Sequence, residues 1–402
     1  MSAHKFSNDA EIIAFVHQHT DLVGEVADFN VSEIGDGNIN FIYRVANTQG
    51  QSVIVKQALP YVRIIGEGWP LSLDRVRIEA EALAIEGQYA PAYVPKLFHF
   101  DAPRSAIIME DVGDHENLRL ALTERRALPN VAKQLAEFLA NTLFYTSDMA
   151  LDAYDRKKNL GSFINPDLCK ITEDLFFLDP YCDHERNSYN PLLVDDVHSL
   201  WGDEALKAEV AELKYRFLNN AQALLHGDLH SGSVFVRSDS TKVIDPEFAF
   251  YGPIGFDVGS VIGNLLLNYC AQFEQAGAEE ERAAYQAFLL SAVKTLWHEF
   301  AQTFSLLLIE HTQDESLRTE LWQQKLLRNI LSDSLGYAGT EMIRRTIGLA
   351  HVFDLDSIED EVCRARAEHK AVRLGRRLIM QREVIASKSV LTIDEAVDSL
   401  VV

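Results

Sequence analysis

Two aspartates and a glutamate stand where short apolar runs end within residues 224–257. Asp228 follows L-L-H-G, whereas Asp245 and Glu247 follow V-I in the turn D-P-E, in which Pro246 restricts the backbone. Polar turn residues separate the two runs, which predicts a pair of loops that bring the carboxylates to one mouth. Phosphoryl transfer from ATP requires one carboxylate for a hydroxyl proton and another for a metal.

The loop around Asp228 contains more polar chemistry than an ordinary turn needs. An aspartate after glycine is usually only a turn residue, but this loop, H-G-D-L-H-S-G-S, also carries His226, His230 and Ser233. We therefore predict that Asp228 orients a substrate hydroxyl and accepts its proton. The two carboxylates of D-P-E are hard oxygen ligands of the kind that Mg²⁺ prefers.

A glycine loop and a lysine lie upstream of these acids. Residues 35–40 read G-D-G-N-I-N, and Lys56 closes the β-branched run S-V-I-V. Backbone amides of such a loop can line phosphates, although a plain hairpin turn would carry the same glycines. An edge-strand lysine is the ordinary alternative for Lys56, which we predict to contact the α- and β-phosphates while paired to a helix glutamate. Glu79 and Glu81 are both candidates for that partner, and Glu79 is preferred because it begins the pattern E-A-x-A-L.

Residues 62–71 read V-R-I-I-G-E-G-W-P-L and place Trp69 among glycines and a proline. Glycines beside an aromatic residue suit a lid that excludes water during phosphoryl transfer. A connector whose tryptophan packs on the core has the same composition, so both interpretations stay open.

Arg344 and Arg345 are adjacent in T-E-M-I-R-R-T-I. Neighbouring helix positions point about 100° apart, so both side chains can reach one site only near a helix end or at a bend. Doubled arginines usually lie on a solvated face. In a chain this acidic, they are also candidates to neutralise a transferring phosphate or to bind substrate hydroxyls.

The elements that must position these residues change in type along the chain. Helices are expected at 7–19 and 74–86, and strands at 29–34, 41–45, 53–56, 94–100 and 106–110. From residue 124 onward the pattern is mainly helical. The prediction is an α+β protein with two lobes, an N-terminal nucleotide-binding lobe at 1–111 and a helical lobe at 112–402 that carries the substrate site.

The amino-acid composition limits the kinds of partner and the compartment that are expected for this chain. The 402 residues carry a net charge of −23, which argues against nucleic acid or a membrane surface as a partner because both would repel the chain. The four cysteines form no C-x-x-C pair, so neither a zinc site nor a disulfide framework is expected. The N-terminus shows no signal-peptide pattern and no apolar run approaches the roughly 20 residues of a membrane helix, so a cytoplasmic location is expected.

The order of these motifs resembles the protein-kinase-like small-molecule kinases, the superfamily of the aminoglycoside and choline kinases. H-G-D-L-H with a lysine far upstream carries that resemblance, which runs from about residue 29 to residue 377. The turn D-P-E, the segment G-E-G-W-P-L and the adjacent arginines are similar to those of the methylthioribose kinases within the superfamily. The resemblance implies a bilobal fold, a five-stranded antiparallel sheet with a helix in the smaller lobe, and a homodimer that works in methionine salvage.

The resemblance also implies roles for individual residues. ATP would be contacted by Asn40, Lys56, Glu79, Asp245, Pro246 and Glu247, with adenine held by the hinge Glu110, Asp111 and Val112. Asp228 would act on the 1-hydroxyl of methylthioribose, with Arg344, Arg345 and Trp69 at the sugar. Mg²⁺ would be held by Asp245 and Glu247.

Two positions depart from the wider kinase pattern. Asn40 stands where a third glycine is usual, and Ser233 stands where a metal-binding asparagine is usual, five residues after Asp228. Ser233 is therefore a weaker candidate metal ligand, and Glu247 either replaces it or contacts the metal through water. The alternatives are a kinase for choline, an aminoglycoside or another sugar, and a nucleotide-sensing protein without catalytic activity.

Overall fold

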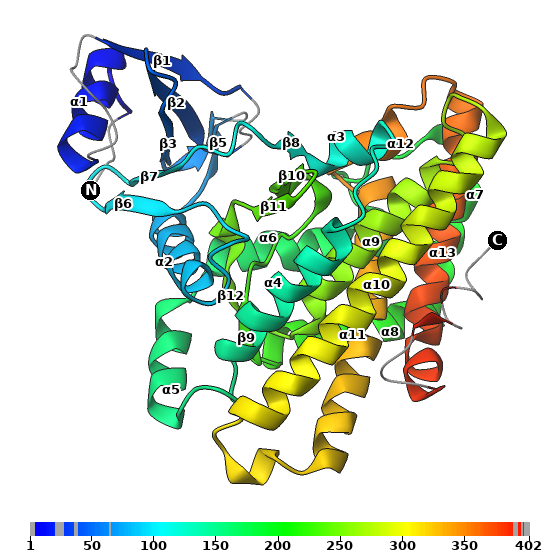
Figure 1. Cartoon of the computed structure of the whole chain (residues 1–402). Helices are drawn as coiled ribbons and strands as arrows, with labels where there is room; N and C mark the ends of the chain where they lie inside the picture. Colours follow the sequence, from blue (N-terminus) through cyan, green and yellow to red (C-terminus); the bar gives the residue numbers. More distant parts are fainter. Residues whose placement is uncertain are drawn as a thin grey trace.

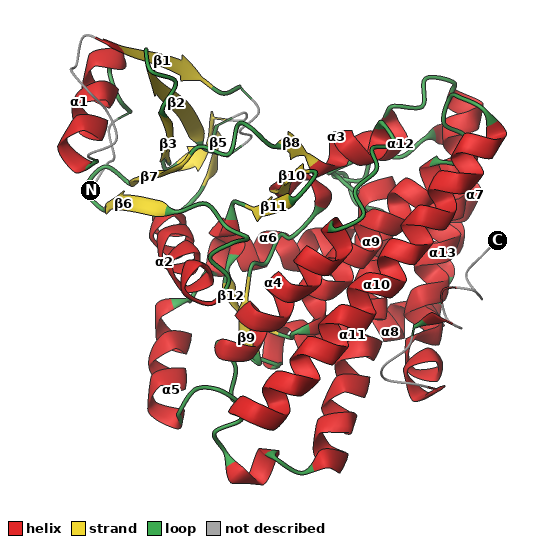
Figure 2. Ribbon diagram, viewed as in Figure 1, coloured by secondary structure: helices red, strands yellow, loops and turns green. Residues whose placement is uncertain are grey.

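The computed structural model describes residues 5–20, 28–35, 39–63, 66–388, 393, 394 and 397. A β-sheet with two helices forms the N-terminal part, and a larger body of helices follows it (Figures 1 and 2). The predicted α+β class is thereby confirmed.

The sheet contains the five predicted strands, all antiparallel to their neighbours, in the order β1-β2-β3-β7-β6. Its strands are β1 (Phe29–Glu33), β2 (Phe41–Asn47), β3 (Ser52–Gln57), β6 (Leu97–Asp101) and β7 (Ala106–Glu110). The strand expected at 94–100 begins only at Leu97. Pro95 lies just before it and has no N–H to donate to a neighbouring strand.

Two helices cover opposite faces of this sheet. Alternate side chains of a strand point to opposite faces, so Val53 and Val55 pack with α1 (Asp9–His19), whereas Ile54 packs on the side of α2 (Asp74–Tyr89). Lys56 lies two residues after Ile54 in the same strand, so its side chain also points toward α2. Helix α1 begins two residues later than predicted because Asn8 caps it, accepting a hydrogen bond from the Glu11 N–H at 3.0 Å.

A short hairpin joins β3 to α2 and was not predicted as strands. Its strands are β4 (Tyr61–Val62) and β5 (Gly66–Pro70), and Trp69 lies on β5. The glycines and the proline of this segment hide its strand character from a pattern based on β-branched residues.

The helical body is built around three long, mutually packed helices, α9 (Gly255–Ala271), α11 (Glu320–Ile347) and α13 (Glu361–Lys388). Every residue of α9 is buried. Helices α11 and α13 approach closely at two glycines, since a Cβ on Gly339 would lie 2.4 Å from the carbonyl oxygen of Gly375. The remaining helices are α3 (Leu118–Thr123), α4 (Val131–Tyr145), α5 (Ala153–Ser162), α6 (Pro166–Phe177), α7 (Val194–Gly202), α8 (Glu204–Asn219), α10 (Glu279–His311) and α12 (Phe353–Asp356).

Short strand pairs position the loops between the sheet and the helices. Strand β9 (Ala223–Leu225) pairs with β12 (Phe250–Gly252), and β10 (Val234–Arg237) pairs with β11 (Ser240–Val243) and with β8 (Glu116–Asn117). The loops that follow β9 and β11 contain H-G-D and D-P-E.

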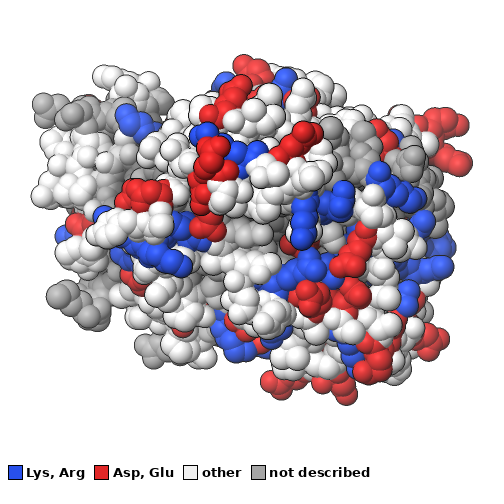
Figure 3. Space-filling view, turned by 90° about the horizontal axis from the view of Figure 1, so that it is seen from below, with Lys and Arg blue, Asp and Glu red and all other residues white. Residues whose placement is uncertain are grey.

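Charged side chains of both signs lie interspersed on the face of the molecule shown in Figure 3. Among the described helices, none is long and apolar enough to cross a membrane.

Candidate active site

The backbone of the H-G-D loop is held by a buried carboxylate. Asp257, in the first turn of α9, accepts hydrogen bonds from the N–H groups of His226 at 2.7 Å and Gly227 at 3.1 Å. Gly227 has a φ of 84°, and a Cβ there would lie 2.3 Å from the carbonyl oxygen of Phe248, so only glycine fits. Sequence reasoning assigned no role to Asp257, because one aspartate in the first turn of a helix does not show which distant backbone it will bind.

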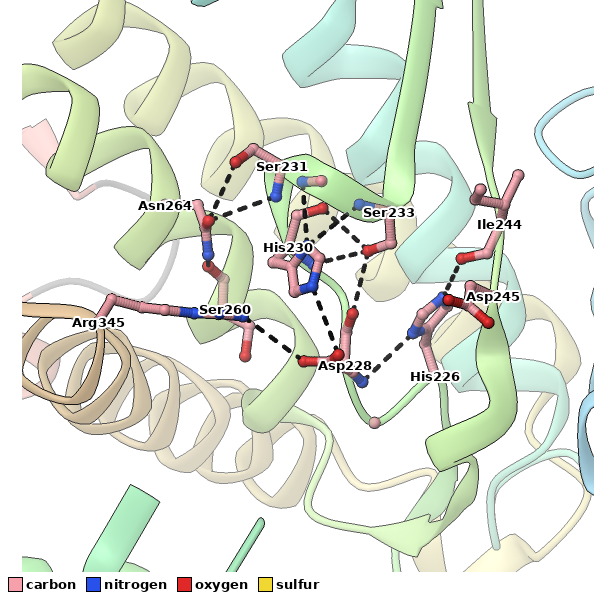
Figure 4. Close-up of polar contacts among 12 residues, drawn as sticks. His226, Asp228, His230, Ser231, Ser233, Ile244, Asp245, Ser260, Asn264 and Arg345 are labelled. Atoms are coloured by element: carbon pink, nitrogen blue, oxygen red, sulfur yellow. Dashed lines mark hydrogen bonds and ion pairs between the residues drawn. The ribbon is translucent and has the colours of Figure 1, made fainter. Parts of the chain in front are cut away.

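The carboxylate of Asp228 lies among three nitrogen groups. Arg344 Nη2 and Arg345 Nη2 lie 3.6 and 3.8 Å from its Oδ1 atom, and His230 Nε2 lies 3.4 Å from its Oδ2 atom. Figure 4 shows Asp228 between His230 and Arg345. Burial favours the protonated acid, but His230 and the two arginines outweigh burial and hold the pKa of Asp228 well below its usual range. Asp228 is therefore ionised, and 29% of its side chain is exposed.

The two adjacent arginines converge because they lie in the last turn of α11 and share one carboxylate. Glu341, fully buried one turn earlier, accepts from Arg344 Nε at 2.5 Å and from Arg345 Nε at 3.0 Å. The Arg344 guanidinium also stacks over Phe176, with its Cζ atom 3.8 Å from the ring centroid. This arrangement meets the expectation that both arginines reach one site only near a helix end.

Lys56 forms a buried ion pair with Glu79. The distance from Lys56 Nζ to Glu79 Oε1 is 2.9 Å, and both side chains are buried. Burial disfavours the charged lysine, but Asp245 and Glu79 outweigh it and raise the pKa of Lys56 above its usual range. Glu81, the other candidate partner, instead pairs with Arg77 Nη1 at 2.8 Å on the partly exposed side of α2.

The D-P-E turn brings two more carboxylates to this lysine. Asp245 contacts Lys56 Nζ, adopts the left-handed conformation with φ 72°, and exposes 44% of its side chain. Carboxylate oxygens of Asp245, Glu247 and Glu79 lie within 4.8 Å of one another. Burial raises the pKa of Glu79 against the attraction of Lys56, and the two neighbouring carboxylates raise it further. A concentration of hard oxygen ligands fits a divalent cation such as Mg²⁺.

Asn40 and Arg75 hold Glu247 from the side of the sheet. Asn40 Nδ2 donates to Glu247 Oε2 at 2.8 Å, and Asn40 Oδ1 accepts from Arg75 Nε at 3.2 Å and Nη2 at 3.0 Å. Arg75 Nε itself lies 3.6 Å from Glu247 Oε2. The predicted ATP-binding residue Asn40 is thus buried and engaged with the D-P-E turn, while positions 36–38 of the glycine loop lie outside the described residues. Arg75 was missed because one arginine at a helix start carries no motif.

The side-chain hydrogen bonds of Ser233 lie within its own loop. Its hydroxyl donates to the carbonyl oxygen of Asp228 at 3.0 Å and accepts from the His230 N–H at 3.0 Å. It closes the turn of the H-G-D loop (Figure 4). His226 connects this loop to the D-P-E turn, because its Nε2 atom lies 2.9 Å from the carbonyl oxygen of Ile244.

The predicted hinge joins β7 to β8. Asp111 Oδ2 accepts from Ser52 Oγ at 2.6 Å and pairs with Arg44 Nε at 2.7 Å, and Glu110 Oε2 accepts from the Lys96 N–H at 3.0 Å. These acidic side chains therefore fix the hinge to the sheet. Val112 accepts a backbone hydrogen bond from His115 at 2.9 Å.

Trp69 packs on apolar neighbours, as expected of a connector, and its role in a lid stays a prediction. It packs with Leu71, Leu168, Ile171 and Phe248, and it also lines a cavity of about 310 Å³ between β5 and α6. The charged residues of that cavity are Asp167, Lys170, Asp174 and Arg186.

A second group of possible metal ligands lies on the α1 face of the sheet. His19, His99 and Asp101 have ligand atoms within 4.8 Å of one another. The two imidazole rings are stacked at 3.7 Å with an interplanar angle of 9°, so their in-plane lone pairs run parallel and do not converge on one ion. This cluster lies on the face opposite Lys56.

Comparison with known proteins identifies the family. The model of the phosphotransferase enzyme family matches residues 30–301. A methylthioribose kinase from Yersinia pseudotuberculosis serotype IB (strain PB1/+) is 49% identical over 381 residues, covering 94% of this chain and 93% of that protein. A methylthioribose kinase from Yersinia enterocolitica is 47% identical over 388 residues, covering 96% and 97%.

A solved choline kinase from Cryptosporidium parvum Iowa II aligns with a TM-score of 0.46 and 13% identity, over 96% of this chain and 99% of that one. The assignment rests on the sequence relatives, whose identity and coverage extend across both the sheet and the helical body. The chain belongs to the methylthioribose kinases, within the phosphotransferase enzyme family.

Proposed function

We propose that this protein transfers the γ-phosphoryl group of ATP to the 1-hydroxyl of S-methyl-5-thioribose, giving the sugar 1-phosphate and ADP. The hydroxyl oxygen forms the new bond to phosphorus, the bond from phosphorus to the β,γ-bridging oxygen breaks, and the hydroxyl proton passes to Asp228. The observation that carries the proposal is the convergence of Arg344 and Arg345 on one oxygen of Asp228. A base beside two fixed cations suits transfer of an anionic group.

An ionised Asp228 fits a late proton transfer. A carboxylate held ionised by His230 and two arginines is a weak base, so it orients the hydroxyl in the ground state without deprotonating it. The proton transfers late, when the oxygen has begun to bond to phosphorus and has become acidic.

Lys56 and Mg²⁺ would balance the negative charge of the ATP phosphates. Lys56 is kept charged and is fixed by Glu79, which suits a contact with the α- and β-phosphates. Asp245 and Glu247 would hold Mg²⁺, which when bound neutralises phosphate charge, and Ser233 remains a second, weaker candidate ligand. The exposure of Asp245 and the burial of Glu247 make Asp245 the direct ligand in this proposal.

The remaining assignments concern nucleotide and sugar. Adenine would bind the backbone of Glu110, Asp111 and Val112, Asn40 and Pro246 would border the nucleotide, and Trp69 would cover the sugar. We propose a lobe boundary between residues 111 and 112, at this hinge. We also propose a cytoplasmic homodimer in methionine salvage, with no nucleic acid or membrane as partner.

A substrate panel tests the function. ADP release would be followed with methylthioribose, other sugars, choline and an aminoglycoside as acceptors, with Mg²⁺ and ATP present. Methylthioribose is expected to be preferred, since a cationic amine would be repelled by Arg344 and Arg345. Preferred turnover of an amine would overturn the substrate assignment, and ATP binding without ADP release from any acceptor would favour a nucleotide-sensing role.

A further inference from the structure

We propose that His230 is a positioning residue for Asp228, donating its Nε2–H to Oδ2 so that Oδ1, the oxygen facing the arginines, is presented to the substrate hydroxyl. This inference rests on the proposed kinase function and adds a residue to it. His230 acts through Asp228 and does not itself receive the substrate proton.

The hydrogen bonds of His230 determine which nitrogen carries its proton. Nδ1 lies 3.0 Å from the Gly232 N–H, 3.1 Å from the Ser233 N–H and 3.3 Å from Arg119 Nη2, all of which are donors. Nδ1 must therefore be an acceptor, which leaves the proton of the neutral ring on Nε2. Nε2 is the atom that lies 3.4 Å from Asp228 Oδ2.

The contacts of Nδ1 require a neutral ring, because a charged ring would place a second N–H against three donors. Burial lowers its pKa, and Arg345 and Arg119 lower it further, against the opposing effect of Asp228. Further charged groups of this region are Glu341, Arg344 and Asp354. Donation from Nε2 engages Oδ2 of Asp228 and leaves Oδ1 to the arginines and to the substrate hydroxyl. The 3.4 Å contact is long for a hydrogen bond, as catalytic contacts often are before substrate binds.

A chain of hydrogen bonds connects Arg119, which contacts His230, with Arg345 on the other side of Asp228. Arg119 Nε donates to Ser231 Oγ at 3.1 Å, and Ser231 Oγ donates to Asn264 Oδ1 at 3.1 Å. Asn264 Nδ2 in turn donates to Glu341 Oε1 at 2.9 Å, the oxygen that also accepts from Arg345 Nε. Helices α3, α9 and α11 thus hold His230 and Arg345 beside Asp228. Figure 4 shows the contacts of Ser231 with Asn264 and of Arg345 with Asp228.

His230 also has a purely structural role, because its Nδ1 caps the turn Ser231–Ser233. Two substitutions separate the roles. In H230N the side-chain oxygen can occupy the position of Nδ1 and keep the cap, but the shorter side chain cannot reach Asp228. In H230Q the amide NH₂ can approach the position of Nε2 and restore the donor to Asp228, while the cap is lost.

The experiment compares wild type, H230N and H230Q in steady-state ADP release with methylthioribose, alongside thermal unfolding. We expect H230N to unfold near the wild-type temperature but to lose about tenfold or more in kcat, with the KM for ATP changed less than twofold. We expect H230Q to unfold at a lower temperature yet to retain a higher kcat than H230N. H184N is the matched control, because His184 Nδ1 also accepts a loop N–H, from Arg186 at 3.2 Å, and it should retain wild-type kcat.

Wild-type kcat in H230N would overturn the positioning role while leaving the proposed function intact. Equal losses of kcat and thermal stability in both variants would likewise overturn it, by making His230 only a cap. If wild type itself preferred another acceptor, the proposed substrate would fail, and the same comparison made with that acceptor would still decide the role of His230.

Discussion

Asn40 Nδ2 donates a hydrogen bond to Glu247 Oε2 at 2.8 Å, joining the sheet directly to the D-P-E turn. Asn40 immediately precedes β2 and is also held by Arg75 of α2, so two segments outside the D-P-E turn determine where the Glu247 carboxylate lies. The departure of this loop from a third glycine therefore has a structural use, which is to hold an acidic residue beside Lys56 and Asp245.

The first prediction concerns the metal. E247Q keeps an oxygen that can accept from Asn40 but removes the charge, so the Mg²⁺ concentration needed for half-maximal ADP release should rise roughly 10-fold to 100-fold. S233A is the comparison, because the Ser233 hydroxyl is engaged within its own loop and its loss should alter the Mg²⁺ dependence much less. A larger shift in S233A than in E247Q would make Ser233 the ligand.

The second prediction separates the two helix glutamates. E79Q removes the carboxylate that fixes Lys56 and should lower kcat/KM for ATP by about tenfold or more, which corresponds to about 1.4 kcal/mol of transition-state stabilisation. E81Q disrupts only a partly exposed pair with Arg77, worth at most about 1 kcal/mol of folding stability, and should leave kcat/KM unchanged. Steady-state ADP release at varied ATP measures both, and equal effects would contradict the assignment.

The third prediction concerns the base. D228N keeps the size of the side chain but cannot accept a proton, so kcat should fall by about 10²-fold to 10⁴-fold. ATP affinity, measured by calorimetric titration, should stay within about twofold, since Lys56 and the D-P-E turn are untouched. Turnover within a few fold of wild type would exclude Asp228 as the proton acceptor.

The fourth prediction concerns stability in acid. Burial favours the protonated acid, but Arg344 and Arg345 outweigh burial and lower the pKa of Glu341 from 4.5 to about 2. Between these pH values the unfolded chain binds a proton that the folded chain does not. The stabilisation from Glu341 is therefore complete above about pH 4.5 and is lost as the pH falls toward 2.

Urea unfolding between pH 2.5 and 7 checks this prediction. E341Q should be less stable than wild type at pH 7, by up to about 3 to 5 kcal/mol, because the buried arginines lose their nearest carboxylate and keep only Asp228 as a charge partner. The difference between the two proteins should narrow as the pH falls through the window. A difference that stays constant from pH 7 to pH 2.5 would contradict the lowered pKa of Glu341.

The local elements and the chemically reactive motifs were predictable from the sequence. Strand and helix periodicity extend over only a few residues, so the five strands of the sheet and helix α2 follow from short windows. H-G-D and D-P-E each place a carboxylate within one turn, so residue order alone identifies Asp228, Asp245 and Glu247 as candidates.

Contacts between distant segments were decided only by the tertiary structure. Glu79 and Glu81 lie on different sides of one helix, and the side that meets Lys56 depends on how α2 packs on the sheet. The convergence of Arg344 and Arg345 depends on Glu341 and on where α11 ends.

The sequence by itself thus determined the family and the chemical groups, because these depend on residue type and order along the chain. The tertiary structure alone decided that Asn40 holds Glu247, that Ser233 bonds within its loop, and that His230 faces Asp228 with Nε2. Each of those relationships depends on the orientation of a side chain within packed helices and loops, and orientation is not encoded in spacing.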